Sequence, residues 1–323
     1  MSLISRPDAF VFIHQGLPSY LLCSLYQAHF ASPKLRKILV SDIDPKLPFV
    51  DWINLNYFSD SWNEMAAVYV HLSTNQASFE RFCFYRWFVL RAVMKNRGLT
   101  RIIHLDSDVM VYFDPLEEVA DLGAHRFAIG STSSYSGHFA VINSLTVIDE
   151  ICDVMVNLFA DPANLGELEE HFKRQGPLGG GVCDMYALGW IIWNKRMPCF
   201  ELNVIRDYGV FDQALRDPRV AGKRKVWRMK GGKKVVKWKN SRPFFLTIDG
   251  DEVRALTIHF QGDCKSLMRS CLTQVTTDFL EKYYAMRIGE WSHFMLNHVT
   301  RRARHYKQGV YKRSKKLMSR LGL

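Results

Sequence analysis

Two aspartates lie one residue apart at the end of an apolar segment, in the run Ile102-Ile103-His104-Leu105-Asp106-Ser107-Asp108. The apolar residues do not alternate with polar ones, which predicts a buried strand that is central and parallel. Open α/β sheets bind ligands at the carboxyl ends of such strands, and two neighbouring carboxylates repel each other if left unpaired. Mg²⁺ and similar cations are often held by one or two carboxylates plus substrate phosphates. The pattern predicts a metal that carries a diphosphate; a solvated turn is the alternative.

Strand and helix patterns alternate through the segment that leads to this motif. Strands are predicted at 10–14, 37–42 and 53–57, and helices at 20–30 and 79–95. The Asn96-Arg97-Gly98 sequence ends the last helix, as glycine commonly does. Alternation of this kind is typical of a doubly wound α/β domain with a largely parallel sheet.

The second half of the chain has a different pattern. Strands are predicted at 127–131 and 138–143, then a helix at 144–159, a flexible loop at 176–181 and a helix through Asp184, Tyr186 and Trp190. Two hairpins are predicted, one with strands 226–229 and 235–238 around Gly231-Gly232, the other with strands 244–248 and 253–260 around Asp249-Gly250. We therefore expect one mixed α/β domain at 1–300, followed by a basic helical tail at 301–323.

Cysteine content and hydropathy bear on the cellular location. The seven cysteines form no Cys-x-x-Cys pair, and 48% of the 323 residues are hydrophobic. An odd number of unpatterned cysteines is typical of reduced thiols in a folded cytosolic protein. No run approaches the roughly 18 apolar residues that a membrane-spanning helix needs. We expect a cytoplasmic protein, or one that is peripheral on the inner face of a membrane.

The net charge of +11 is concentrated in two segments. Ten lysines or arginines and no acidic residue lie between Lys223 and Arg242, and nine more lie between Arg301 and Arg320. Removing those 19 from the 43 basic residues leaves 24 basic and 32 acidic residues, so the net charge of the remainder is about −8. A nucleic-acid-binding protein would be suggested by the basic pI and by Trp227 and Trp238 among lysines. The acidic remainder argues against nucleic acid and favours an anionic membrane or a phosphorylated substrate as the partner of the basic segments.

Three segments resemble motifs of nucleotide-sugar-dependent glycosyltransferases of the GT-A fold, closest to the glycogenin-like and lipopolysaccharide galactosyltransferase-like group. The first is Tyr85-Arg86 ahead of Leu105-Asp106-Ser107-Asp108-Val109, and the second is Asp184-Met185 after the glycine-rich loop. The third, Ile258-His259-Phe260-Gln261-Gly262-Asp263-Cys264-Lys265, is similar to a His-Phe-x-Gly-x-x-Lys motif. The resemblance implies a Rossmann-like nucleotide-binding half in a GT-A-like domain. Ser266-Leu267-Met268 departs from the Pro-Trp that usually follows the lysine in the glycogenin-like group.

The resemblance also implies roles for individual residues. Asp106, Asp108 and His259 would hold Mn²⁺ or Mg²⁺, and neutral imidazole suits Mn²⁺ better. The nucleoside-diphosphate sugar would be contacted by His14, Gly16, Tyr20, Asp42, Arg86, Asp106, Ser107, Gly262 and Lys265, and the sugar by Ser136, Gly137 and Asn143.

Arg86 and Asp184 are the candidate catalytic residues. Arg86 lies on an aromatic helix face, where a buried guanidinium needs a partner such as an aspartate of the acidic pair or the diphosphate. A structural ion pair is the alternative for Arg86. Asp184 could accept hydrogen bonds from sugar hydroxyls, and a helix N-terminal cap is its alternative.

The resemblance implies metal-dependent transfer of a sugar from a nucleoside diphosphate, with UDP as the expected nucleotide, to a hydroxyl of a glycan or glycolipid with retention of configuration. Retention needs no dedicated base, because the leaving phosphate can deprotonate the acceptor, whereas inversion would make a carboxylate such as Asp184 the base. The alternative enzyme is a phosphatase of the haloacid-dehalogenase type, in which Asp106 would be the nucleophile. About a hundred residues precede Asp106, whereas that motif usually lies near the N-terminus.

Overall fold

The structure is a computed structural model that describes residues 6–119, 122, 125–131, 134–175, 180–194, 197–223 and 225–290. The chain divides into one compact unit that ends at Gln274 and a second that begins at Val275. In the second unit residues 277–290 are helical, and the Thr276 hydroxyl accepts the N–H of Phe279 at 3.1 Å. The predicted tail at 301–323 and its boundary lie outside the described residues and stay predictions.

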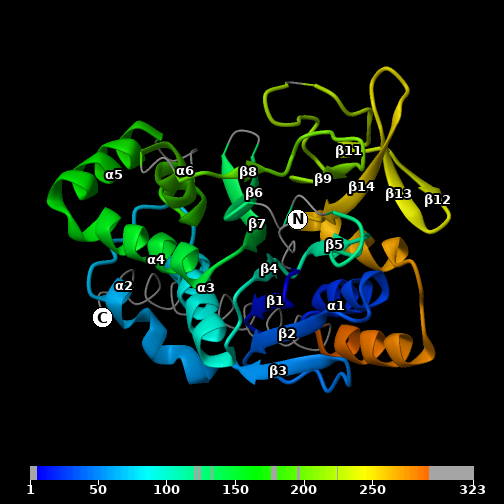
Figure 1. The fold of residues 1–323 in the computed structure, drawn as a ribbon, viewed down its shortest axis with the longest axis horizontal. Helices are drawn as coiled ribbons and strands as arrows, with labels where there is room; N and C mark the ends of the chain where they lie inside the picture. Colours follow the sequence, from blue (N-terminus) through cyan, green and yellow to red (C-terminus); the bar gives the residue numbers. More distant parts are fainter. Residues whose placement is uncertain are drawn as a thin grey trace, which may run out of the picture. The chain divides into compact units, whose positions relative to one another are not determined.

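A seven-stranded mixed sheet forms the centre of the first unit (Figure 1). In spatial order its strands are β3 (Val50–Asn54), β2 (Arg36–Ser41), β1 (Ala9–His14), β4 (Ile102–Leu105), β7 (Tyr135–Ile142), β6 (Phe127–Ser131) and β8 (Phe200–Glu201). The first four are parallel to one another, and β7 is antiparallel to both of its neighbours. The predicted mixed, mostly parallel sheet is confirmed, with the strand before the acidic pair at its centre.

Helices flank this sheet, as expected for the fold class. Helices α3 (Ala77–Arg97), α4 (Leu145–Ala160) and α6 (Asp184–Asn194) share one hydrophobic core with Ala9, Val11 and Ile13 of β1. The alternate residues Phe10 and Phe12 face the opposite side, because successive strand side chains point to opposite faces. Helix α1 (Ser19–Ala31) contacts β2 and β5 (Val109–Val111), and lies apart from α3 and α4 in Figure 1.

A second sheet brings the end of the unit to the acidic motif. It comprises β12 (Val236–Lys239), β13 (Arg242–Leu246), β14 (Glu252–His259) and β5, and β9 (Val210–Phe211) pairs with β14. β5 begins directly after Asp108, and its Val109 lies opposite His259 in the antiparallel pairing. The 3₁₀ helix η4 (Gly262–Cys271) follows β14. Two motifs about 150 residues apart in the sequence are thus adjacent in space.

Local signals located most elements correctly, and three expectations were wrong or incomplete. The third strand ends at Asn54, because a 3₁₀ helix, η1 (Leu55–Trp62), replaces its expected second half and precedes α2 (Asn63–Ala66). The hairpin at Gly231-Gly232 consists only of β10 (Met229–Lys230) and β11 (Lys233–Lys234), since Val236–Lys239 pairs with β13 instead. Helix α5 (Pro162–Gln175) was not predicted.

Helix ends and cysteines agree with the sequence analysis. Gly98 ends α3 in the left-handed conformation, and the Ser144 side chain caps α4. All seven cysteines are described and free. No helix among the described residues is long and apolar enough to cross a membrane.

Candidate active site

The Asp106-Ser107-Asp108 turn joins β4 to β5, and main-chain hydrogen bonds hold it on both sides. The N–H of Asp106 donates to the carbonyl of His138 in β7 at 2.8 Å. The N–H of Phe260, just past β14, donates to the carbonyl of Asp108 at 2.8 Å. The turn therefore lies between the carboxyl end of β4 and the end of β14, which is the place where a parallel sheet binds ligands.

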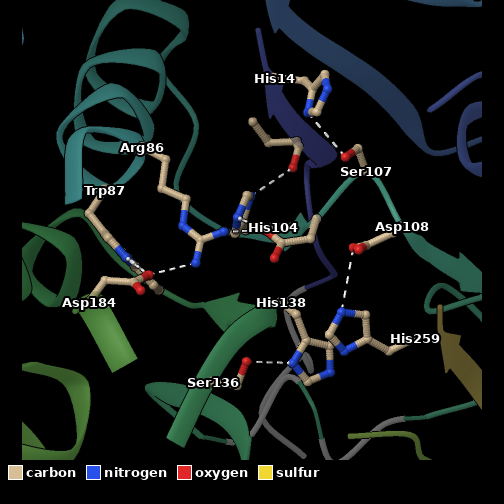
Figure 2. A network of polar contacts seen from close by, with 12 residues as sticks. His14, Arg86, Trp87, His104, Ser107, Asp108, Ser136, His138, Asp184 and His259 are labelled. Carbon is tan, nitrogen blue, oxygen red and sulfur yellow. Dashed lines mark hydrogen bonds and ion pairs between the residues drawn. The ribbon is translucent and has the colours of Figure 1, made fainter. Parts of the chain in front are cut away.

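Arg86 projects from α3 and bridges two carboxylates (Figure 2). Its Nη1 pairs with Asp106 Oδ1, and its Nη2 lies 2.5 Å from Asp184 Oδ2, which also accepts from Trp87 Nε1 at 3.1 Å. Burial by itself would raise the pKa of Asp106, but Arg86 and His104 outweigh it and hold that pKa well below its usual range. The acidic pair is thus one of the two partners expected for Arg86, and Asp184 is a second carboxylate on the same guanidinium.

Asp108 faces two cationic or protonatable groups from the C-terminal motif. Its Oδ1 lies 3.5 Å from His259 Nε2, and its Oδ2 lies 3.1 Å from Lys265 Nζ. Burial and Asp106 raise the pKa of Asp108, whereas His259 and Lys265 lower it more, so the net shift is downward. Gly262 has φ +65°, a left-handed conformation that favours glycine, at the first residue of the 3₁₀ helix that carries Lys265.

His14, Ser107 and Tyr20 form a polar group beside the acidic turn. His14 Nδ1 lies 3.1 Å from Ser107 Oγ, and its Nε2 lies 3.4 Å from the Tyr20 hydroxyl. The Lys265 ammonium lies 4.9 Å from the centre of the Tyr20 ring. Burial and the charge of Lys265 lower the pKa of His14. The fold thus gathers four of the predicted nucleotide-contacting residues, and their contact with a nucleotide stays a prediction.

The loops after β1 and β2 are joined by one hydrogen bond. The N–H of Gly16 donates to Asp42 Oδ1 at 2.6 Å, and Gly16 has φ +78°. Glycine adopts this conformation without the steric cost that a Cβ adds. Asp42 therefore orders the loop after β1, and its predicted contact with the nucleoside-diphosphate sugar stays a prediction.

Two stacked histidines lie below Asp108 in the view of Figure 2. The rings of His138 and His259 are 4.3 Å apart and 9° from parallel. His138 Nδ1 lies 2.9 Å from Ser136 Oγ, and His259 Nδ1 lies 2.7 Å from the carbonyl of Gln213. Burial and the neighbouring His259 lower the pKa of His138 to about 3, so it is neutral near pH 7. Ser136 thus orients His138 at the edge of the site.

Of the three predicted sugar contacts, one was wrong and one has a structural role. Asn143 lies past the far end of β7, where its Nδ2 donates to the carbonyls of Leu122 and His125. It sits opposite the start of β4, away from Asp106, so the antiparallel pairing of β7 rules it out of the site. Gly137 is buried against Trp87, where it makes room for the ring that binds Asp184.

Gly137→Ala is expected to lower the free energy of unfolding by about 1–3 kcal/mol, the usual cost of overpacking. A Cβ at Gly137 would lie 2.4 Å from Trp87 Cζ2, so the indole must shift. The control is Gly166→Ala in helix α5, where a Cβ meets nothing within 4 Å and alanine should stabilise the helix. Urea unfolding of both variants checks this, and equal stability of Gly137→Ala and the wild type would contradict it.

The three predicted metal ligands, Asp106, Asp108 and His259, are only partly arranged to hold a divalent cation. Among the described residues no group of three or more His, Cys, Asp or Glu side chains is arranged to hold a metal ion. Asp108 and His259 lie together, whereas Asp106 is paired with Arg86. One or two carboxylates are often enough where substrate phosphates complete the coordination, and here Asp108 supplies a carboxylate and His259 an imidazole. The chemistry of Asp108 and His259 therefore fits a metal that binds together with a diphosphate.

Three residues of this region escaped sequence reasoning. His138 occurs in a predicted strand, where a single histidine is most often a core residue, and Asp212 belongs to no motif. Lys234 is one of the ten basic residues between Lys223 and Arg242, and the sequence does not distinguish it from the other nine. The structure places His138 on His259 and connects Asp212 with Lys234 by an ion pair.

The sequence matches no protein-family model and no curated protein. Solved structures that match include mouse xyloside xylosyltransferase 1, which is 12% identical with a TM-score of 0.45 over 60% of this chain and 84% of that one. The galactosyltransferase LgtC in complex with donor and acceptor sugar analogues is 12% identical, with a TM-score of 0.38 over 85% and 99% of the two chains. The glycosyltransferase GlyE of Streptococcus pneumoniae is 15% identical, with a TM-score of 0.31 over 61% and 46%.

Proposed function

We propose that this protein is a glycosyltransferase that moves a sugar from a nucleoside diphosphate to a hydroxyl of a glycan or glycolipid. The expected nucleotide of the donor is UDP. One observation carries the proposal. The Asp106-Ser107-Asp108 turn at the carboxyl end of the central parallel strand faces His259 and Lys265 of the distant C-terminal motif. Acidic, imidazole and ammonium groups at this place suit a metal-bound diphosphate better than a neutral ligand.

We assign the divalent metal, Mn²⁺ or Mg²⁺, to Asp108 and His259, with Asp106 as the third candidate ligand. Bound there, the ion would neutralise charge on the leaving diphosphate. Lys265 would contribute a second positive charge from η4, and its ammonium is already at 3.1 Å from Asp108. Arg86 would keep Asp106 ionised and in place through their ion pair.

Retention of configuration agrees best with the state of Asp184. Inversion would need a carboxylate such as Asp184 as general base, within reach of the acceptor hydroxyl. The Asp184 side chain is only 3% exposed, and its Oδ2 is bound by Arg86 and Trp87. A carboxylate that is buried and held by two donors in this way has little access to an acceptor hydroxyl, which supports a reaction in which the leaving phosphate takes the proton.

The test is to incubate the protein with Mn²⁺, a panel of nucleotide sugars and simple glycan acceptors, and to measure nucleotide release and the glycosylated product. Transfer from one donor supports the proposal. Hydrolysis of p-nitrophenyl phosphate without sugar transfer would favour the phosphatase alternative instead. No described contact favours that alternative, because Asp106 is paired with Arg86 and is thereby weakened as a nucleophile.

Lys265→Ala is expected to lower kcat as well as donor affinity, by about 2–4 kcal/mol in kcat/KM, as for other electrostatic contacts to developing charge. The lysine faces Asp108 and lies over Tyr20, so its charge is directed into the site. Steady-state kinetics with the preferred donor measure the change, and exposed Lys230→Ala is the control. Wild-type kinetics in Lys265→Ala would show that this lysine does not contact the diphosphate.

We also propose that the protein is cytoplasmic and that its residues 301–323 bind an anionic membrane. These residues interleave nine basic side chains with Tyr306, Val310, Tyr311, Leu317, Met318 and Leu321. Each basic residue near such a surface contributes about 1 kcal/mol. Full-length protein should co-sediment with anionic liposomes at low salt, and a chain that ends at Val299 should not. Equal sedimentation of the two would rule the tail out as an anchor.

A further inference from the structure

Lys234 differs from the other basic residues of its segment. Of the ten between Lys223 and Arg242, it is the one that is buried among those the structure describes. Its ammonium pairs with Asp212 Oδ1, and the two side chains are 1% and 0% exposed. The charge also lies over the rings of Trp227 and Phe245, at 5.6 and 5.0 Å from their centres. Such a fully desolvated pair is held in place from several sides.

Asp212 uses its remaining acceptors on the two stacked histidines. Its Oδ2 accepts the main-chain N–H of His259 at 3.0 Å, and its carbonyl lies 2.9 Å from His138 Nε2. The next carbonyl, that of Gln213, lies 2.7 Å from His259 Nδ1. Asp212 and Gln213, which follow β9 directly, therefore contact His259 twice and His138 once.

These contacts decide which nitrogen of each ring carries the hydrogen. A carbonyl oxygen can only accept, so His259 must donate from Nδ1 to Gln213, and His138 must donate from Nε2 to Asp212. His259 Nε2 is then the nitrogen that faces Asp108, at 3.5 Å. A ligand histidine is commonly oriented in this way by the partner of its other nitrogen.

A buried ion pair is weak evidence for stability, because well-packed apolar residues of similar volume often replace it without loss. We propose that the Lys234–Asp212 pair is a positioning device: it fixes the Asp212 carboxylate so that the 212–213 segment holds His259 with Nε2 toward Asp108. This inference rests on the function proposed above for the same site, and it makes Lys234 and Asp212 positioning residues.

The variant to compare with the wild type is the double change Lys234→Met and Asp212→Asn, which removes both charges together. A single Lys234→Met would leave Asp212 buried and unpaired and could prevent folding. In the double variant the new amide at position 212 can still accept from His259, but no cation fixes its orientation. The control is Lys233→Met, the adjacent residue of the same hairpin, whose side chain forms no ion pair with another described residue.

The first measurement is the tautomer of His259, from long-range ¹H–¹⁵N spectra of histidine-labelled protein. His259→Gln and His138→Gln spectra assign the two signals among the eleven histidines. In the wild type and in Lys233→Met, Nδ1 of His259 should carry a hydrogen, because the Gln213 carbonyl can only accept. In the folded double variant a fraction of the molecules should lack the hydrogen on Nδ1. An Nδ1 that stays fully protonated in the double variant would overturn the proposal.

The second measurement is sugar transfer, in which the double variant should lose at least tenfold in kcat and less in acceptor KM. Lys233→Met should retain wild-type values. The two measurements separate the two proposals. A wild type that transfers no sugar, but whose His259 tautomer depends on Lys234 and Asp212, would refute the proposed function and leave the positioning role in place. An unchanged tautomer with wild-type kinetics in the double variant would make the ion pair purely structural.

Discussion

Asp108→Asn is expected to lower sugar transfer about 10³-fold or more, because a ligand of a charge-neutralising metal is worth several kcal/mol in the transition state. The amide keeps the shape of the carboxylate but removes the charge that faces His259 and Lys265. The fold should persist, since the main-chain carbonyl of residue 108 still accepts from Phe260. Transfer assays with and without Mn²⁺, and with EDTA, measure the effect.

The matched control is Asp263→Asn, in the same motif as His259 and Lys265. The Asp263 side chain is 67% exposed and pairs with Arg216 on the surface. Exposed pairs of this kind contribute little, so its kinetics should equal those of the wild type. Full activity of Asp108→Asn, or of the wild type in EDTA, would refute the metal assignment.

Arg86→Met is expected to lower the free energy of unfolding by about 3–5 kcal/mol, because it leaves buried carboxylates without their counter-charge. The guanidinium pairs with both Asp106 and Asp184, and its side chain is 12% exposed. Chemical denaturation of the metal-free and ligand-free protein separates this stability effect from any effect on donor binding. Arg86→Met with Asp184→Asn should recover part of the loss, since one of the two charges is then removed.

Arg91→Met on the same helix is the control for Arg86→Met. Arg91 pairs with Glu64 and Asp153, whose side chains are largely exposed to water. Loss of such a pair should cost no more than about 1 kcal/mol. If Arg86→Met and Arg91→Met were equally stable, the ion pairs of Arg86 with Asp106 and Asp184 would contribute no more to stability than an exposed pair does.

The elements of the first half could be predicted because their signals are local. The apolar run before Asp106 is a central parallel strand, and Gly98 ends α3 as its residue type suggests. Helix α5 was missed, because its segment is mostly polar and only Leu168 of its fourteen residues is buried. The split of the 226–238 hairpin was also missed, because β-branched residues suit any neighbouring strand and do not select β13 over β10.

For the candidate site too, some features could be predicted from local sequence and others depend on which strands pair. By itself the sequence determined the chemical types and order of Asp106, Asp108, His259 and Lys265, through spacing and resemblance. Only the tertiary structure decided their partners: the pairing of β14 with β5 brings His259 to Asp108, and that of β7 with β4 takes Asn143 away. Residue spacing encodes turns, caps and periodicity, which depend on neighbours a few positions away. The partner of a buried charge, such as Lys234 for Asp212, is set by which distant strands pair, and no local pattern records that choice.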